Sequence, residues 1–508
     1  MLVQEFLEKT ADRTPGKTAL ICDGQRLTYA DVEMQANRVA TALRGRGLRR
    51  GERVGIYLPN SVELVVGIFA VLKAGGVFVV VNATAKADKL ASILKNCTAS
   101  ALLTSAQQMD PAHSLQSAVP SLRTIVLTGD VPPSARLPTV LTYADIQAQV
   151  PPDRPPCVNI DLDLACLIYT SGTTGEPKGV MSDHSNVDFA STSITTYLEN
   201  TPDDIVIDVL PLSFDYGLYQ LLMTFKVGGT LVLERGFAYP AAVLKQIETE
   251  RVTGLPGVPT LFSLLLQMDL GAFDLSSLRY ITNTAAALPA SHILRLRERL
   301  PWATLYSMYG LTETKRTLYL PPDQLDQRPG SVGIAIPGTE VWLQDEHGQR
   351  LGPGLTGELI VRGRHVMRGY WGDAALTAAR FRPGLLPGER VCYSGDLFRM
   401  DEAGYFYFIA RKDDMLKSRG EKVAPVEVER VLYELEGVVE AAVVGVPDPV
   451  LGQAIKAFVV AQGRTLTERD VLAHCRSRLE DFMVPQQVEF REALPKTPSG
   501  KIRKADLQ

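Results

Sequence analysis

The sequence lacks the cysteine and histidine spacings that mark structural metal sites. It contains six cysteines and six histidines in 508 residues, and no two cysteines stand in a Cys-x-x-Cys arrangement. The histidines are scattered, so no zinc site is expected. Several cysteines lie in apolar runs, as Cys166 does within Leu164–Ile168, which favours buried free thiols over disulfide bonds.

An excess of charge of either sign is also missing. Lys and Arg number 53 against 57 Asp and Glu, which gives a formal net charge of −4. The chain therefore has no overall basic field of the kind that attracts nucleic acid or an anionic membrane surface. No nucleic acid partner is expected.

Uninterrupted apolar segments of membrane length are absent from the sequence. The longest apolar run, Val65–Val81, is broken by Lys73, Gly75 and Gly76, and this predicts a helix, a turn and a strand instead of a membrane span. Residues Met1–Thr10 show no basic segment followed by an apolar one, so no signal peptide is expected. These features predict a cytoplasmic protein.

The sequence does contain the alternation that is typical of an α/β protein. Its composition, with 45% hydrophobic and 22% charged residues, is that of a globular protein, and its length predicts two to four domains. Within residues 27–129, a strand at Val54–Leu58 precedes a capping-box spacing, Asn60 with Glu63, and a helix at Leu64–Leu72. Such alternation predicts a doubly wound α/β sheet.

Three further segments complete the expected architecture. After the proline-rich connector Pro151–Pro156, residues 205–308 repeat the α/β alternation, which predicts a second sheet packed on the first. Residues 330–400 show short alternating strands with glycine turns, and the rest resembles a compact α+β unit. We therefore expect an α/β fold with a large N-terminal domain (1–411) of two doubly wound sheets plus a small β-barrel-like subdomain, and a C-terminal α+β domain (412–508).

A polar stretch after the apolar run at Leu164–Ile168 has the composition of a phosphate-binding loop. Residues 169–179 read Tyr-Thr-Ser-Gly-Thr-Thr-Gly-Glu-Pro-Lys-Gly, with four Ser/Thr hydroxyls, three glycines and Lys178. Glycines let the backbone approach a ligand, and successive N–H groups in such a turn bind anions. No Walker spacing fits here. The alternative is a solvated surface loop rich in small residues.

The order of residues in this stretch resembles the phosphate-binding loop of the adenylate-forming superfamily, which includes acyl-CoA synthetases, peptide-synthetase adenylation domains and firefly-type luciferases. Three more stretches match in the family's order: Tyr309–Thr314, Tyr393–Asp396 and Leu494–Arg503. The resemblance spans nearly the whole chain. It implies an AMP-forming acid–thiol ligase that uses ATP and Mg²⁺.

The resemblance also assigns roles to individual residues. It implies that Tyr309 stacks on adenine, Thr312 contacts phosphate, Glu313 holds Mg²⁺, and Asp396 and Arg411 bind the ribose. The implied catalytic residues are Thr170, Lys178, Glu313 and Lys501. The full set implied for ATP and AMP is Thr170, Ser171, Gly172, Thr173, Thr174, Gly175, Lys178, Tyr309, Gly310, Thr312, Asp396, Arg411 and Lys501.

The C-terminal domain is implied to be mobile. Asp413 takes the place of the family's hinge, Gly420 lines the path of the thiol, and Lys501 is the mobile catalytic lysine. A cation beside the α-phosphate would stabilise charge that builds as pyrophosphate leaves. The chain departs from the pattern at Ala410, where the family usually has glycine, and this departure would slow domain rotation if the hinge needs unusual dihedral angles.

The acid pocket is expected around Phe214 and Asp215, because peptide-synthetase domains place an aspartate after an aromatic residue to pair with the substrate's α-amino group. The competing interpretation is that Asp215 caps the helix from Leu218. Thr284-Ala285 replaces a glycine pair and should narrow the pocket. Arg316 is a polar intrusion that would also suit an acidic or thioester-bearing partner. The full expected lining is Phe214, Asp215, Tyr216, Tyr219, Met308, Arg316 and Thr317.

These patterns favour adenylation of a small amino acid and transfer to the phosphopantetheine thiol of a separate acyl or peptidyl carrier protein. The alternative is an acyl- or aryl-CoA synthetase with CoA as the thiol. A non-catalytic nucleotide-binding regulator is disfavoured because Lys178, Glu313 and Lys501 are all present. A luciferase-like oxygenase shares the same adenylation residues.

Overall fold

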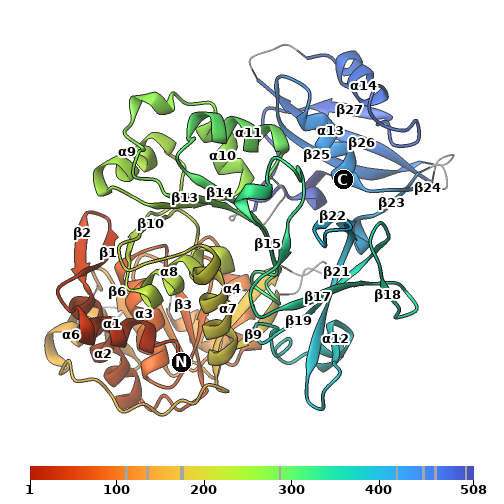
Figure 1. Ribbon diagram of the computed structural model, residues 1–508. Helices are drawn as coiled ribbons and strands as arrows, with labels where there is room; N and C mark the ends of the chain where they lie inside the picture. Colours follow the sequence, from red (N-terminus) through yellow and green to blue (C-terminus); the bar gives the residue numbers. More distant parts are fainter. Residues whose placement is uncertain are drawn as a thin grey trace.

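Four β-sheets organise the chain in the structure, a computed structural model (Figure 1). It describes residues 1–108, 112–132, 137–171, 177–284, 288–418, 421–448, 452–462, 466–497 and 500–507. Two large sheets of seven and nine strands form the main body. An antiparallel sheet of six strands and a C-terminal sheet of five strands lie beside them in Figure 1.

The seven-stranded sheet has the order β7-β6-β5-β3-β4-β8-β9 and is parallel from β7 to β8, with the edge strand β9 antiparallel. The apolar run of residues 65–81 forms a helix, a turn and strand β4, as the sequence predicts. The strands are β3 (Arg53–Tyr57), β4 (Val77–Val80), β5 (Ala101–Ser105), β6 (Thr124–Thr128), β7 (Val140–Thr142), β8 (Leu164–Ser171) and β9 (Pro177–Asp183).

The nine-stranded sheet has the order β16-β15-β14-β13-β12-β10-β11-β1-β2. Its centre is parallel and the β15, β16 and β2 edges are antiparallel. The first strand of the chain joins this second sheet by pairing with β11, which the sequence did not reveal. The strands are β1 (Thr18–Cys22), β2 (Gln25–Thr28), β10 (Ile205–Asp208), β11 (Thr230–Leu233), β12 (Gly254–Gly257), β13 (Tyr280–Asn283), β14 (Thr304–Tyr309), β15 (Leu318–Leu320) and β16 (Ile334–Ala335).

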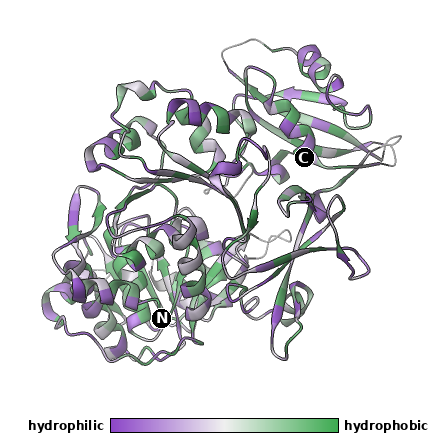
Figure 2. Ribbon diagram, viewed as in Figure 1, coloured by the Kyte–Doolittle hydropathy of each residue, from purple (hydrophilic) through white to green (hydrophobic). Residues whose placement is uncertain are grey.

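Helices connect these strands, and buried residues of both large sheets and of α2, α3, α7 and α8 form one continuous apolar core. Figure 2 shows that hydrophobic residues concentrate on the central strands and hydrophilic residues on the outer helices. The helices of the main body are α1 (Glu5–Arg13), α2 (Tyr29–Gly45), α3 (Val62–Lys73), α4 (Ala87–Asn96), α5 (Ala112–Ala118), α6 (Tyr143–Gln149), α7 (His184–Tyr197), α8 (Asp215–Val227), α9 (Pro240–Glu250), α10 (Pro259–Leu265) and α11 (Ala290–Arg299).

The small β unit expected after residue 330 is the six-stranded antiparallel sheet, in which the long strand β21 pairs with β19, β20 and β22. The apolar core of this unit also includes Val180 of β9 and Leu318 of β15, so the unit packs against the edges of both large sheets. Its elements are β17 (Glu340–Gln344), β18 (Arg350–Leu351), β19 (Thr356–Arg362), α12 (Ala374–Arg380), β20 (Phe381–Pro383), β21 (Arg390–Met400) and β22 (Phe406–Arg411).

The C-terminal sheet has the order β24-β23-β26-β25, with β27 pairing β26. It meets the main body where the ring of Tyr433 packs edge-on against His292 of α11, with ring centroids 6.1 Å apart. The elements are β23 (Leu416–Ser418), β24 (Glu421–Val423), α13 (Pro425–Tyr433), β25 (Val438–Asp448), β26 (Gly452–Ala461), α14 (Glu468–Arg476) and β27 (Gln487–Phe490), preceded by the 3-10 turn η4 (Lys412–Asp414).

The helices bear on two predictions made from the sequence: the absence of a membrane span and the cap of α3. Over the described residues, none of the helices is both long and apolar enough to cross a bilayer. The capping-box prediction at Asn60 is wrong, because Ser61 caps α3 through its hydroxyl, which accepts from the N–H of Leu64. Asn60 instead joins the two large sheets: its Nδ2 donates to the carbonyls of Leu210 and Glu234 at 2.9 and 2.8 Å.

A substitution at this junction tests whether Asn60 joins the two sheets or caps α3. Asn60 is 6% exposed and its Oδ1 also accepts from the N–H of Leu212 at 3.1 Å, so Asn60→Ala removes three buried hydrogen bonds. We expect a loss of about 3 kcal/mol in the free energy of unfolding, measured by urea denaturation. The control Ser61→Ala should lose about 1 kcal/mol. A larger loss for Ser61→Ala than for Asn60→Ala would contradict the assignment.

Candidate active site

The loop between β14 and β15 brings several motif residues together. The backbone N–H of Thr317 donates to the carbonyl of Tyr309 at 2.9 Å and closes the loop at its base. A Cβ placed on Gly310 would lie 1.8 Å from the carbonyl oxygen of Lys315. The loop can fold back on itself only with glycine at this position. Gly310, expected at the nucleotide, therefore also has a packing role.

The side chains of Tyr309, Asp396 and Arg411, which the resemblance assigns to the nucleotide, contact one another. The Tyr309 hydroxyl donates to Oδ2 of Asp396 at 2.6 Å, and Nε of Arg411 donates to Oδ1 at 3.3 Å. Asp396 and Arg411 are directly opposite each other in the β21–β22 pair. Burial raises the pKa of Asp396, and the Arg411 guanidinium and the Tyr309 hydroxyl oppose this rise. The ring of Tyr309 packs edge-on against Phe398, with centroids 4.9 Å apart.

Two hydrogen bonds from the segment around residue 370 hold Glu313 in place. Its Oε1 accepts from the Tyr370 hydroxyl at 2.6 Å, and its backbone carbonyl accepts from the N–H of Met367 at 3.0 Å. Within the described ranges, no group of three or more His, Cys, Asp or Glu side chains could hold a metal ion by itself. One oriented carboxylate fits Mg²⁺, which takes its other ligands from water and nucleotide phosphates.

The phosphate-loop motif joins strands β8 and β9 of the seven-stranded sheet. Thr170 pairs with Lys178 and Tyr169 with Gly179, so Thr170 and Lys178 are neighbours on the hairpin. A Cβ on Gly179 would lie 3.0 Å from the Tyr169 ring, which explains a glycine there. Gly172, Thr173, Thr174 and Gly175 lie outside the described residues, as do Gly420, Ala285 and the side chain of Ser171.

The aromatic wall expected for the acid substrate lies at the start of α8. Phe214 is the N-cap residue and makes no side-chain cap, and Asp215 is the first residue of the helix, so the interpretation of Asp215 as N-cap is wrong. Asp215 is 6% exposed. The rings of Phe214 and Tyr216 pack edge-on with centroids 6.4 Å apart, and the Tyr216 hydroxyl donates to the carbonyl of Thr282 at 2.9 Å.

Two of the other expected pocket residues have packing partners. The Sδ of Met308 lies 2.9 Å from the Tyr197 hydroxyl, and the hydroxyl of Thr317 lies 2.7 Å from that of Thr314. Both side chains are therefore engaged within the protein. Thr284 is buried and its hydroxyl has no hydrogen-bond partner in the described part of the chain.

Two adjacent basic side chains are buried beside this wall. Lys315 is fully buried, and its Nζ lies 5.5 Å from the ring centroid of Tyr219. Arg316 is 2% exposed, and its Cζ lies 4.4 Å from the ring centroid of Tyr216. Burial lowers the pKa of Lys315, and the Asp215 carboxylate opposes this shift. Two cations in a buried position are costly unless anions accompany them.

Lys501 reaches the same wall from the C-terminal segment. Its ammonium lies 5.5 Å from the ring centroid of Phe214. The preceding carbonyl, that of Gly500, accepts from the Thr260 hydroxyl of α10 at 3.3 Å, and a Cβ on Gly500 would lie 2.8 Å from that hydroxyl. Burial lowers the pKa of Lys501, and Asp215 opposes this shift. The structure therefore joins Lys501 to residues almost three hundred positions away.

The residues around the expected hinge have ordinary backbone geometry. Asp413 is exposed in η4, between β22 and β23. Ala410 is buried within β22, opposite Leu397, and is not among the residues with positive φ. The alanine that replaces the family's glycine is therefore unstrained in this conformation.

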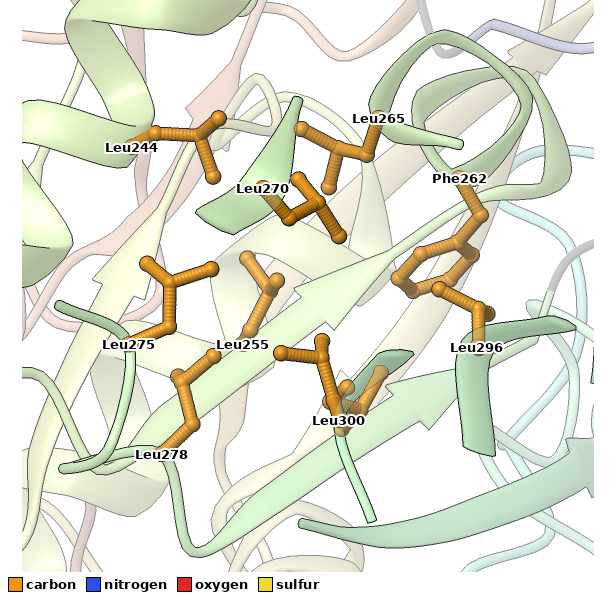
Figure 3. Close-up of a pocket in the computed structure, with 10 residues that line it drawn as sticks. Leu244, Leu255, Phe262, Leu265, Leu270, Leu275, Leu278, Leu296 and Leu300 are labelled. Atoms are coloured by element: carbon orange, nitrogen blue, oxygen red, sulfur yellow. The ribbon is translucent and has the colours of Figure 1, made fainter. Parts of the chain in front are cut away.

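A small cavity elsewhere in the main body is not the acid site. It has a volume of about 10 Å³ and is lined only by apolar side chains from the region of β12, α10 and α11, including Leu255, Phe262 and Leu296 (Figure 3). This volume is at the lower limit for one water molecule, and no polar side chain lines it. It is a packing defect in the core.

The sequence interpretation missed three residues of the site. Lys315 stands beside Arg316 in a polar stretch, Thr312–Thr317, so its burial has no clear signal in the sequence. Tyr370 and Arg380 carry no sequence signal either, since their proximity to Glu313 arises only in the fold. The Glu313 carboxylate helps to raise the pKa of Arg380 against the effect of burial, and Nε of Arg380 is buried with no hydrogen-bond partner among the residues that the structure describes.

The fold and these residues define an enzyme that activates a carboxylic acid by attaching AMP from ATP. The chain belongs to the AMP-binding enzyme family. The family's sequence profile matches residues 7–371, and the profile of the AMP-binding enzyme C-terminal domain matches residues 427–501.

Several similar proteins carry the names of CoA ligases or synthases. The chain is 35% identical to the feruloyl-CoA synthase of Amycolatopsis sp over 98% of this chain and 97% of that protein. It is 32% identical to the long-chain-fatty-acid–CoA ligase of Bacillus subtilis (strain 168), over 99% and 94%. It is also 30% identical to gramicidin S synthase 2 of Brevibacillus brevis, over 99% of this chain and 11% of that protein.

Solved structures agree with this assignment. The anthranilate CoA ligase AuaEII, crystallised with anthranoyl-AMP, superposes with a TM-score of 0.92 at 29% identity and covers 100% of this chain and 96% of its own. ATP-dependent adenylation of an acid is thus the activity that the family shares, and the match with CoA ligases favours the CoA alternative over the carrier protein.

The burial of Lys315 predicts an effect of its substitution on stability. The substitution Lys315→Met removes a buried ammonium. The backbone strain of the positive φ of 59° is the same for methionine as for lysine. The free energy of unfolding should therefore rise by about 1 kcal/mol or more. Between the lowered pKa of Lys315 and the ordinary value of 10.5, the unfolded state binds more protons than the folded state. The gain should therefore shrink as the pH rises towards 10.5.

Urea denaturation at several pH values measures this gain. The control is Lys245→Met, because Lys245 is 67% exposed in its pair with Glu248 and its loss should change stability by less than about 0.5 kcal/mol. A loss of stability in Lys315→Met equal to that of a cavity mutant would contradict the assignment of a costly buried charge.

Proposed function

We propose that the protein is an acyl- or aryl-CoA synthetase: it forms an acyl-AMP from a carboxylic acid and ATP, and then the thioester of CoA. The observation that carries this proposal is the match with CoA ligases over practically the full length of both chains, which includes the C-terminal segment with Lys501. The position of Lys501 beside the acid wall supports the first half-reaction.

In the first half-reaction a carboxylate oxygen attacks the α-phosphorus of ATP, and pyrophosphate leaves. Thr170, Lys178 and Thr312 would bind the phosphates, and Glu313, held by Tyr370, would hold Mg²⁺. Lys501 would stabilise the negative charge that builds on the α-phosphate, an electrostatic effect worth about 3–4 kcal/mol in comparable sites. Magnesium would neutralise part of the phosphate charge.

The adenosine would be held by the tyrosine and the carboxylate that meet in the site. The Tyr309 ring would stack on adenine, and Asp396 with Arg411 would bind the ribose hydroxyls. Asp396 is 2% exposed, and its two oxygens already accept from Tyr309 and Arg411, so its orientation is set before the nucleotide binds. Gly310 would let the nucleotide approach the loop backbone.

In the second half-reaction the CoA thiolate attacks the acyl carbonyl, and AMP leaves. We propose that residues 412–508 form a domain that rotates about Asp413 relative to residues 1–411, withdraws Lys501 and admits the thiol along a path past Gly420. The exposure of Asp413 in a short turn between two sheets supports this position for a hinge. Closure would also keep water from the acyl-AMP.

A second candidate is adenylation of a small amino acid for a carrier protein. The buried Asp215, directly after Phe214, and the full-length match with a segment of gramicidin S synthase 2 favour it. The charge distribution weighs against it, because Asp215 already acts on two lysines, Lys315 and Lys501, and has less need of a substrate ammonium. Thr284, Met308 and Thr317 would line either pocket.

The role of Lys501 is testable by substitution. Lys501→Ala should slow ATP–pyrophosphate exchange by about 100- to 1,000-fold, because one charge-stabilising donor is lost, while the dissociation constant for ATP stays nearly unchanged. The control is Lys504→Ala, three residues further on, whose ammonium is paired with Glu429 at 2.6 Å. Normal pyrophosphate exchange in Lys501→Ala would refute the assigned role.

An assay that supplies both CoA and a carrier protein decides which thiol the enzyme uses. ATP–pyrophosphate exchange identifies the acids that are activated, from panels of aryl, acyl and amino acids. Each active acid is then incubated with CoA or with a phosphopantetheinylated carrier protein, and thioester is measured by mass spectrometry. We expect acyl-CoA to form. Thioester on the carrier alone, with an amino acid as substrate, would establish the second candidate instead.

A further inference from the structure

The guanidinium of Arg316 presents an unused hydrogen-bonding edge. Its Nη1 donates to the carbonyl of Lys315 at 3.2 Å. Its Nε and Nη2 are buried and have no hydrogen-bond partner in the described part of the chain. These two nitrogens lie on the same edge of the group and carry parallel N–H bonds, the pair that binds a carboxylate in bidentate fashion. Such an edge is rarely left unpaired in a protein interior.

Lys315 places a second cation next to this edge. It is fully buried, and its Nζ has no hydrogen-bond partner among the described residues. Its positive φ of 59° is a conformation that favours glycine, so holding a lysine there adds backbone strain. The main acidic side chains that act on Lys315 are Asp215 and Glu313. Glu313 is the candidate for Mg²⁺, which leaves Asp215 as the main acidic partner of Lys315.

The two ends of the aromatic wall carry different cations. Lys501 lies over Phe214, which packs on Tyr216, which in turn packs on Arg316. A carboxylate that reacts beside Lys501 would extend its carbon chain along these two rings. Its far end would then reach the unused edge of Arg316.

We propose that Arg316, supported by Lys315, forms a subsite for a second carboxylate, and that the acid activated by this enzyme is a dicarboxylic acid with an apolar spacer. This inference rests on the proposed adenylation at Lys501 and deepens it by naming the substrate class. Arg316 is the specificity-determining residue, and Lys315 is a positioning residue that compensates the added charge.

The charges of the site favour this class over the others. A monocarboxylic acid would leave Arg316 and Lys315 with only Asp215, and an amino acid would add a further cation to the same region. A second carboxylate brings the buried charges of Arg316, Lys315 and Asp215 together with the substrate close to neutrality. A buried charge with a partner of ideal geometry costs far less than one without a partner.

Paired substrates test the proposal without reference to the thiol. ATP–pyrophosphate exchange is measured with benzoate against its meta- and para-carboxylated forms, and with hexanoate against adipate. We expect the wild type to have the higher kcat/KM for a dicarboxylic member of at least one series. In Arg316→Met the ratio of kcat/KM, dicarboxylic over monocarboxylic, should fall by about 100-fold. Arg316→Lys, which keeps the charge but not the fork, should give an intermediate ratio.

The matched control is Arg350→Met. Arg350 also lies over an aromatic ring, with its Cζ 4.1 Å from the ring centroid of Trp342, but it is 52% exposed and lies in the antiparallel sheet. In Arg350→Met the ratio of kcat/KM, dicarboxylic over monocarboxylic, should equal that of the wild type. The unfolding midpoint, measured with and without the dicarboxylate, gives a second readout: binding should raise it in the wild type and much less in Arg316→Met.

The outcomes separate this inference from the proposed function. A wild type that activates only monocarboxylic acids, or a ratio that Arg316→Met leaves unchanged, overturns the subsite and leaves the CoA synthetase proposal intact. Exchange with dicarboxylic acids followed by no transfer to CoA supports the subsite and overturns CoA as the thiol. Exchange with amino acids only overturns both.

Discussion

The site depends on how buried charge is balanced. Lys315 and Arg316 are almost completely inaccessible, and Lys501 approaches the same wall from the C-terminal segment. Asp215 is the acidic side chain that acts on both lysines. A cluster with more cations than anions is unstable in a protein interior unless a ligand completes it. In the proposed reaction, the anions that would complete it are the phosphates of ATP and the carboxylate of the acid.

The same constraint explains why the lysine comes from a separate segment. A cation held permanently in the site would remain beside the acyl-AMP when the thiol arrives. Lys501 follows Gly500, whose carbonyl accepts from the Thr260 hydroxyl of the main body at 3.3 Å. In the proposed reaction this contact would be made and broken during turnover, whereas Arg316 and Lys315 lie in the tight loop around Gly310.

The sequence was informative where a local pattern has one structural meaning. The apolar run at 65–81 has the predicted local structure. The described ends of the glycine–hydroxyl stretch at 169–179 belong to strands β8 and β9, and its centre lies outside the described residues. The errors concern side chains with two possible partners. Asn60 and Asp215 are both residue types that favour the N-cap position of a helix. In the structure, Asn60 instead forms hydrogen bonds that join two sheets, and Asp215 lies inside α8.

The sequence by itself determined the class of fold, the family and the chemistry of the reaction, because these reside in short motifs whose residues are close together along the chain. Only the tertiary structure decided which charges lie together without partners. The meeting of Lys501 with Phe214, and of Arg316 with Tyr216, joins distant segments, and burial is a property of everything that surrounds a group. No local sequence pattern encodes the three-dimensional surroundings of a charged group. The class of acid therefore had to be inferred from the fold.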